Sequence, residues 1–159
     1  DAFAAVAVSA HPDPERKGCI AVRWVQFWIP SKTQDGELQL TEIENELRDF
    51  IKTHRVLQLC YDVYQLKQMA QNLSRIVWTE EFSQASDRLV ADKSLLDAIQ
   101  MRQVAHYGDP TLREHVNNAD RKVEGAGKLR IVKRTHALKV DGCVCLSMAH
   151  ARAKSGFAL

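Results

Sequence analysis

Val56-Leu57-Gln58-Leu59-Cys60-Tyr61-Asp62 is an apolar run that ends in a carboxylate. Its length and composition predict a strand, with Asp62 at the carboxyl end. A second stretch, Val140-Asp141-Gly142-Cys143-Val144-Cys145-Leu146-Ser147-Met148-Ala149, places Asp141 at the start of an apolar helix. Two such carboxylates can converge on one point, where their charge needs a partner such as a divalent metal. The spacing also permits, and on its own favours, a turn aspartate and a helix-capping aspartate that are each solvated.

The segments around these stretches predict an alternation of strands and helices. Residues 2–8 predict a strand buried on both faces, and it should pair with residues 19–29 as an antiparallel hairpin. Further strands are expected at residues 55–61, 75–78 and 129–133, helices at residues 41–53, 64–73, 83–103, 111–118 and 139–153, and loops at residues 30–40 and 122–127. This order predicts a mixed α/β layer fold rather than a fully parallel one.

Two details of the predicted helices depend on side-chain spacing. Thr41 and Glu44 predict a capping box at the start of the helix of residues 41–53. In the helix of residues 83–103, the apolar stripe that should face the core comprises Leu89, Val90, Leu95, Leu96 and Ile99.

Length and composition describe an ordinary globular chain. The 159 residues suffice for one domain with a sizeable core, and 45% of them are apolar. The net charge of +2 neither favours nor excludes a nucleic-acid partner, because local clusters of charge matter more. The sequence contains no run of 18 apolar residues, so it predicts no membrane span. The sequence contains no Gly-x-x-x-x-Gly-Lys-Ser/Thr loop, so we expect no ATP binding.

Basic residues gather shortly before Asp141. Lys128, Arg130, Lys133 and Arg134 form a basic strand next to the predicted loop of residues 122–127, and Lys139 stands two residues from Asp141. These five residues are the best candidates for contacts with DNA phosphates, because phosphate binding needs basic side chains and no particular base sequence. A solvated strand face is the alternative interpretation.

Three blocks of sequence, taken in order, resemble one known family. The first is residues 56–62 followed by Gln68-Met69-Ala70. The second is Val104-Ala105-His106-Tyr107-Gly108-Asp109-Pro110-Thr111-Leu112-Arg113, with Asn117-Asn118-Ala119 after it. The third is Lys133, then Lys139-Val140-Asp141-Gly142 and Ser147-Met148-Ala149. Their order and spacing resemble the C-terminal nuclease domain of the large terminase subunit of tailed bacteriophages, over roughly residues 1–153.

The resemblance implies a ribonuclease H-like mixed sheet with an N-terminal antiparallel hairpin and helices on both faces. It implies a nuclease that cuts concatemeric double-stranded viral DNA during genome packaging, with Mg²⁺ or Mn²⁺ in a two-metal site. Asp62 and Asp141 match two acidic metal ligands and catalytic residues of the family. The family has another aspartate on its first, central strand, which we expect upstream of Asp1. Residues 1–159 are therefore expected to be a single nuclease domain, as a fragment without that strand and without the ATPase domain.

The partners implied by the resemblance are double-stranded DNA, the ATPase domain of the same polypeptide, the portal and the small terminase subunit. The implied location is the host cell cytoplasm during virion assembly, with no membrane partner. Two alternatives stay open at this point. One is a catalytically silent module of the same fold that binds DNA or the packaging machinery, and the other is a different ribonuclease H-like enzyme such as a junction resolvase.

Overall fold

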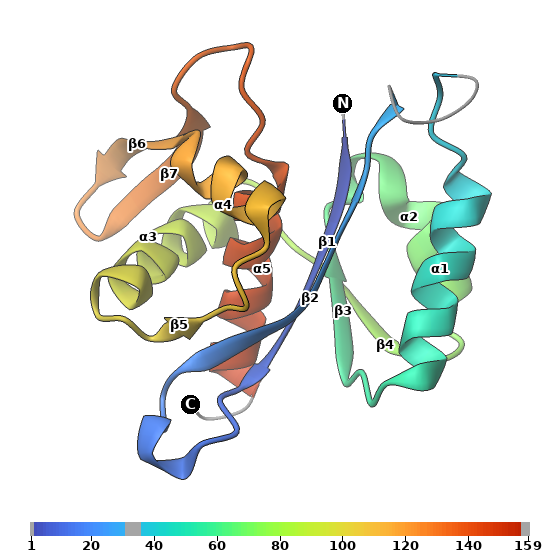
Figure 1. Cartoon of the computed structure of the whole chain (residues 1–159). Coiled ribbons are helices and arrows are strands. Elements are labelled where there is room, and N and C mark those ends of the chain that lie inside the picture. The colour runs from blue at the N-terminus through green and yellow to red at the C-terminus, as the bar shows by residue number, and fades with distance from the viewer. Residues whose placement is uncertain (1, 31–35, 157–159) are drawn as a thin grey trace. The chain divides into compact units, whose positions relative to one another are not determined.

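The computed structural model describes residues 2–30 and 36–156, apart from the side chains of Tyr64 and Gln65. Residues 31–35 of the predicted loop at 30–40 lie outside this description. The chain divides into two units by its internal contacts. Unit 1 holds residues 28–84, and unit 2 holds residues 2–27 together with the residues from 85 onward. Figure 1 labels the helices and strands of both units.

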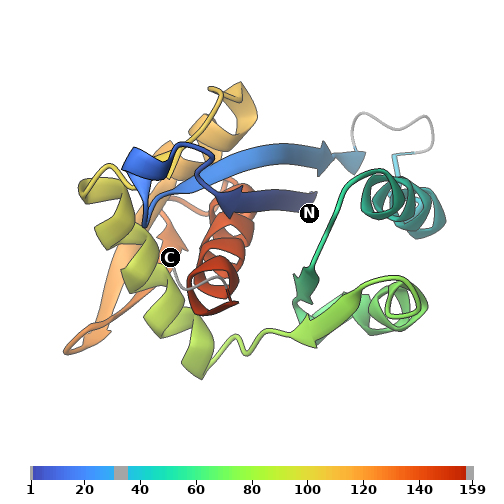
Figure 2. The same cartoon turned by 90° about the horizontal axis from the view of Figure 1, so that it is seen from below.

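Unit 2 contains the predicted N-terminal hairpin. Strands β1 (Phe3–Ala10) and β2 (Ile20–Trp28) are neighbours in one sheet, and Figure 2 shows them running in opposite directions. The connection contains the short helix η1 (Pro14–Arg16). The expected burial of β1 on both faces is wrong, because Phe3 to Ser9 are all half-buried.

Strand β5 (Val104–Ala105) completes this sheet, and it was not predicted. It runs parallel to β2, with Val104 opposite Ile20 and Ala105 opposite Ala21. Two residues are too few to show the period-2 alternation by which a strand is recognised in a sequence. The sheet thus contains both antiparallel and parallel neighbours, which confirms the mixed α/β class.

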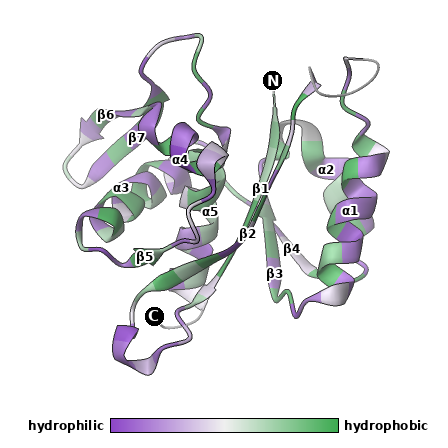
Figure 3. Ribbon diagram, viewed as in Figure 1, coloured by the Kyte–Doolittle hydropathy of each residue, from purple (hydrophilic) through white to green (hydrophobic). Residues whose placement is uncertain are grey.

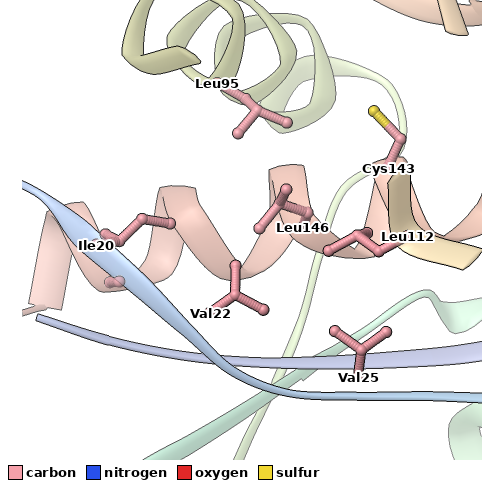
Figure 4. Packing of buried hydrophobic residues seen from close by; sticks show 8 residues of the cluster. Ile20, Val22, Val25, Leu95, Leu112, Cys143 and Leu146 are labelled. Atoms are coloured by element: carbon pink, nitrogen blue, oxygen red, sulfur yellow. The ribbon is translucent and has the colours of Figure 1, made fainter. Parts of the chain in front are cut away.

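Helix α5 (Asp141–Gly156) lies at the centre of the packing in unit 2. It contacts β1, helix α3 (Ser86–Gln100) and helix α4 (Pro110–Asn117). Figure 4 shows side chains from β2, α3, α4 and α5 meeting in one core. The buried members of this core are Ile20, Val22, Val25, Leu95, Leu112, Cys143, Leu146 and Ala153.

The predicted apolar stripe of α3 is confirmed at Leu95 and wrong at Val90 and Ile99, while Leu89 and Leu96 are half-buried. Val90 is 56% exposed and Ile99 is 39% exposed. The buried positions are instead Arg88, Ala91, Asp92, Leu95 and Ala98. Arg88 and Asp92 neutralise each other one helical turn apart, which permits two charged residues to occupy positions that a hydrophobic pattern would assign to solvent.

Strands β6 (Ala119–Gly125) and β7 (Lys128–Lys133) form an antiparallel ribbon. The expected strand at 129–133 is confirmed, but the expected loop at 122–127 is wrong because residues 122–125 belong to β6. Gly125 and Gly127 have φ angles of 135° and 69° and form the turn. Strand β6 is exposed along most of its length and hydrophilic in Figure 3, so its sequence resembles that of a loop.

Unit 1 contains α1 (Leu40–Thr53), β3 (Gln58–Tyr61), α2 (Val63–Leu73) and β4 (Trp78–Glu81). Strands β3 and β4 pair in parallel, with Gln58 opposite Trp78 and Tyr61 opposite Glu81. The helices predicted at 41–53 and 64–73 are confirmed, and Figure 3 shows that α1 has a hydrophobic and a hydrophilic side. The buried apolar residues of this unit are Ile43, Leu47, Ile51, Met69, Ala70, Leu73, Val77 and Phe82.

Two local predictions in unit 1 are wrong. Helix α1 begins at Leu40 after Gln39 and has no side-chain hydrogen bond at its cap, so Thr41 and Glu44 form no capping box. The Glu44 carboxylate instead accepts hydrogen bonds from Arg48 and Asn72. The strand expected at 75–78 begins at Trp78, because the N–H groups of Ile76 and Val77 donate to the Leu73 carbonyl and extend the turn after α2.

No helix among residues 2–30 and 36–156 has the length and apolar character needed to cross a membrane.

Candidate metal centre and nucleic-acid interface

Asp62 lies where the sequence predicts, directly after strand β3 in unit 1. It is half-buried. The Phe82 N–H donates to the Tyr61 carbonyl at 2.9 Å, which keeps the carboxyl ends of β3 and β4 together. Because these strands are parallel, Glu80 and Glu81 on β4 lie at the same edge as Asp62. Glu80 accepts a hydrogen bond from Gln58, whereas Glu81 is exposed.

Asp141 is the first residue of α5 in unit 2, also as predicted. The positive end of the helix dipole there favours a negative charge. Within the described part of the chain, the buried oxygen Oδ2 of Asp141 has no hydrogen-bond partner. A buried carboxylate oxygen without a donor carries a desolvation cost, and a hard cation is one group that can compensate it.

The residues around Asp141 come from α4 and from the segment before α5. The Gly142 N–H donates to Nδ1 of His115 at 2.9 Å, and Nδ2 of Asn118 donates to the Lys139 carbonyl at 3.1 Å. His115 is 5% exposed. Burial lowers the pKa of His115, against the opposing influence of the Asp141 and Glu114 charges. His115 was not a predicted site residue, because nothing in the sequence around it indicates that it meets Gly142.

The donor set of Asp62 and Asp141 suits a hard divalent cation, because both residues offer carboxylate oxygens. They lie in different units, so their convergence on one metal stays a prediction. In the residues that the structure describes, no three His, Cys, Asp or Glu side chains gather as a metal-binding group.

The predicted basic residues occupy two faces of the β6–β7 ribbon and the segment after it. Alternate residues of a strand share a face, so Lys128 and Arg130 lie on one face of β7 and Lys133 lies on the other. Lys122 lies opposite Arg130 and therefore extends the first face, which we call the basic face (Lys122, Lys128 and Arg130). The sequence did not single out Lys122, because it fell in the predicted loop.

Arg134 and Lys139 take part in hydrogen bonds near the open end of the ribbon and after it. Nε of Arg134 donates to the Ala119 carbonyl at 3.1 Å and closes the open end of the ribbon. Lys139 is half-buried, and its carbonyl accepts the hydrogen bond from Asn118. Lys128, Lys133 and Arg134 are exposed, whereas Arg130 is half-buried.

A buried polar network joins the ribbon to the helix that carries Asp141. The Asp92 carboxylate, which is 1% exposed, accepts hydrogen bonds from Arg88 at 3.1 Å and from the hydroxyl of Ser147 at 2.5 Å. It also accepts the Ile131 N–H at 2.8 Å. The network therefore connects α3, α5 and the edge of β7 that faces away from β6.

Residues 24–156 match the family described as terminase large subunit, endonuclease domain. The chain belongs to this family. The match includes both predicted acidic residues and the whole β6–β7 ribbon, which confirms the resemblance seen in the sequence. No curated protein matches this sequence.

Solved structures similar to this chain are terminase nucleases of low sequence identity. The crystal structure of the HK97 bacteriophage large terminase matches with a TM-score of 0.74 and 16% identity, covering 96% of this chain and 39% of that chain. The large terminase nuclease from thermophilic phage G20c matches with TM-scores of 0.64 with bound magnesium and 0.61 with bound cobalt. Those two matches have 13% and 12% identity, each covering 96% of this chain and 82% of that chain.

The likeness confirms the predicted ribonuclease H-like fold. This chain spans less than half of the HK97 large terminase that it matches. The activities and partners of a whole terminase are therefore only proposed for this chain.

Proposed function

We propose that this chain is a divalent-metal-dependent endonuclease domain that cleaves double-stranded, concatemeric viral DNA during genome packaging. The observation that carries the proposal is the buried, unpartnered Oδ2 of Asp141 at the start of α5, in a chain of the terminase endonuclease family. None of the residues that the structure describes donates a hydrogen bond to this oxygen. The G20c relative, solved with magnesium and with cobalt, supports divalent metal dependence for this fold.

In this proposal Asp62 and Asp141 are the acidic ligands of a two-metal site for Mg²⁺ or Mn²⁺. When bound, the metals supply an activated water, neutralise phosphate charge and stabilise the leaving oxygen. The side chains of the protein would hold the metals in place. Asp141 offers the oxygen Oδ2, and the start of α5 favours its negative charge.

The basic face of the β6–β7 ribbon would hold the duplex. Lys122 and Lys128 are exposed, so both can reach phosphates without displacing core residues. Nζ of Lys122 lies 3.3 Å from the Glu124 carboxylate, and a phosphate would compete with this exposed ion pair. Lys133, Arg134 and Lys139 extend the basic character toward the start of α5. The partners that we propose are double-stranded DNA, an ATPase domain of the same polypeptide, the portal and the small terminase subunit, in the host cell cytoplasm during virion assembly.

Replacement of Asp141 tests the catalytic proposal. Asp141→Asn keeps the size of the side chain and removes its charge, so it should abolish the Mn²⁺-dependent nicking of supercoiled plasmid by the full-length polypeptide. We expect Asp62→Asn to do the same. Glu15→Gln removes an exposed carboxylate on η1 and should leave the rate unchanged. Nicking at the wild-type rate by Asp141→Asn would rule out Asp141 as a ligand.

The second candidate function is a catalytically silent module that binds DNA or the packaging machinery. The observation in its favour is that Lys122 and Lys128 are exposed on the β6–β7 ribbon, because binding to DNA phosphates needs basic side chains and no metal ligands. Full-length wild-type protein that binds duplex DNA but does not nick it with Mn²⁺ or Mg²⁺ present would favour this second function.

A further inference from the structure

The first turn of an α-helix has N–H groups without partners inside the helix. In α5 one of these groups, the Gly142 N–H, finds its acceptor outside the helix in Nδ1 of His115. A histidine that accepts at Nδ1 is neutral and carries its proton on Nε2. The lowered pKa of His115, caused mainly by burial, keeps this state dominant near neutral pH.

Close packing accompanies this hydrogen bond. The rings of Phe27 and His115 meet edge to face, with their centroids 4.7 Å apart. A Cβ atom at Gly142 would lie 2.6 Å from Cζ of Phe27 and 3.3 Å from Nδ1 of His115. The backbone at residue 142 therefore approaches both rings as closely as it can, and only glycine leaves room for this approach.

The C-terminus of α4 holds the entry to α5 at a second point. Nδ2 of Asn118, the C-cap residue of α4, donates to the Lys139 carbonyl. Asp141 lies between the two held residues, Lys139 and Gly142. Its backbone is thus fixed on both sides by α4, while its Oδ2 has no hydrogen bond to any described residue.

We propose that His115 is a positioning residue for Asp141, because its hydrogen bond to the Gly142 N–H fixes the first turn of α5 and presents the Asp141 carboxylate to a divalent cation. The metal-binding part of this inference rests on the proposed function. The hydrogen bond to Gly142 is independent of any metal, so the two parts can be tested separately.

The test compares the full chain with two His115 variants and one control. His115→Leu keeps an apolar side chain of moderate size but removes the acceptor. His115→Asn retains an acceptor oxygen near the position of Nδ1. Leu95→Ala removes a core side chain of α3 that is 1% exposed, so it lowers stability without touching residue 115 or 142.

Two measurements are made on each protein: amide hydrogen exchange at Gly142 by NMR, and Mn²⁺ affinity by isothermal titration calorimetry. We expect His115→Leu to speed exchange at Gly142 and to weaken Mn²⁺ binding, each about tenfold, as the loss of one hydrogen bond of typical strength predicts. His115→Asn should restore both values to within about threefold of the wild type. Leu95→Ala should lower the melting temperature and change neither value.

Unchanged amide exchange at Gly142 in His115→Leu would overturn the positioning role. The role would also be overturned if Leu95→Ala changed Gly142 exchange and Mn²⁺ affinity as much as His115→Leu does. Faster exchange with unchanged Mn²⁺ affinity would overturn the part that concerns the metal. A wild-type chain without measurable Mn²⁺ affinity would instead overturn the proposed function of Asp141, while Gly142 exchange would still decide whether His115 fixes α5.

Discussion

At the scale of single residues, Gly142 sets how closely α5 approaches its neighbours. In the interior of a helix, alanine is normally more favourable than glycine by about 1 kcal/mol of helix propensity. Here the added Cβ would lie 2.6 Å and 2.9 Å from atoms of the Phe27 ring, which already packs against His115. We therefore expect Gly142→Ala to destabilise the protein by about 1–3 kcal/mol, as measured by urea unfolding.

Gly156 provides the matched control, because it lies in the same helix and an added Cβ meets nothing within 4 Å among the described residues. Gly156→Ala should leave the free energy of unfolding unchanged or raise it slightly. Equal stabilities of the two variants would show that the close approach at Gly142 does not constrain α5.

At the scale of elements, the β6–β7 ribbon carries basic residues on both of its faces. Lys122 and Lys128 belong to the basic face, whereas Arg121 and Val123 lie on the other face. A cavity of about 240 Å³ beside α3 is lined by Arg121, Val123 and also Lys128. The Ile131 N–H of β7 is bound by the buried Asp92 carboxylate, so the ribbon is anchored to α3 through its backbone and not through its basic side chains. Exchanging those side chains should therefore affect DNA binding more than folding.

The double variant Lys122→Ala and Lys128→Ala tests the basic face. Each lost phosphate contact lowers the slope of log K against log salt by roughly 0.9, so the double variant should lower it by about 2 for any duplex sequence. Fluorescence anisotropy at several salt concentrations measures this, with Lys17→Ala as an exposed control on another part of unit 2. An unchanged slope, together with a lowered slope in Lys133→Ala, would place the DNA on the opposite face.

Arg134 is excluded from this test for a structural reason. Its Nε donates to the Ala119 carbonyl, so its removal would loosen the ribbon as well as remove a charge. A loss of affinity in an Arg134 variant would therefore not separate phosphate binding from folding.

At the scale of the whole molecule, two buried histidines link stability to pH. Burial lowers the pKa of both His115 and His150 below the usual value of 6.5, and nearby Lys154 lowers that of His150 further. A histidine of this kind binds its proton more tightly when the chain is unfolded. Its contribution to stability is thus fully present above about pH 6.5 and is lost as the pH falls toward the lowered pKa.

We expect the melting temperature to fall between about pH 7.5 and pH 5.5, because both histidines favour proton uptake on unfolding over this range. Differential scanning calorimetry in buffers of constant ionic strength measures the change. His150→Gln removes one of the two groups and should reduce the loss. A melting temperature that stays constant over this range in the wild type would contradict the prediction.

The sequence by itself determined the order of most elements, the strand end that carries Asp62 and the helix start that carries Asp141. These features follow from local patterns: a run of apolar residues for β3, the helical repeat of Ile43, Leu47 and Ile51 in α1, and the Asp109-Pro110 start of α4. Each pattern is set by neighbours within a few positions along the chain. The three blocks that resemble the terminase nuclease family predicted the ribonuclease H-like fold, which the structural comparisons confirm.

Only the tertiary structure decided which polar residues are buried and what they hold. Asp92 meets Ile131 and Ser147 across 39 and 55 positions of sequence, and His115 meets Gly142 across 27 positions. Burial of a polar group is stable only when its partner is supplied, and here distant elements supply the partners. A local pattern cannot contain that information, so the sequence does not predict the burial of Arg88 and Asp92 in α3 or the contact between His115 and Gly142.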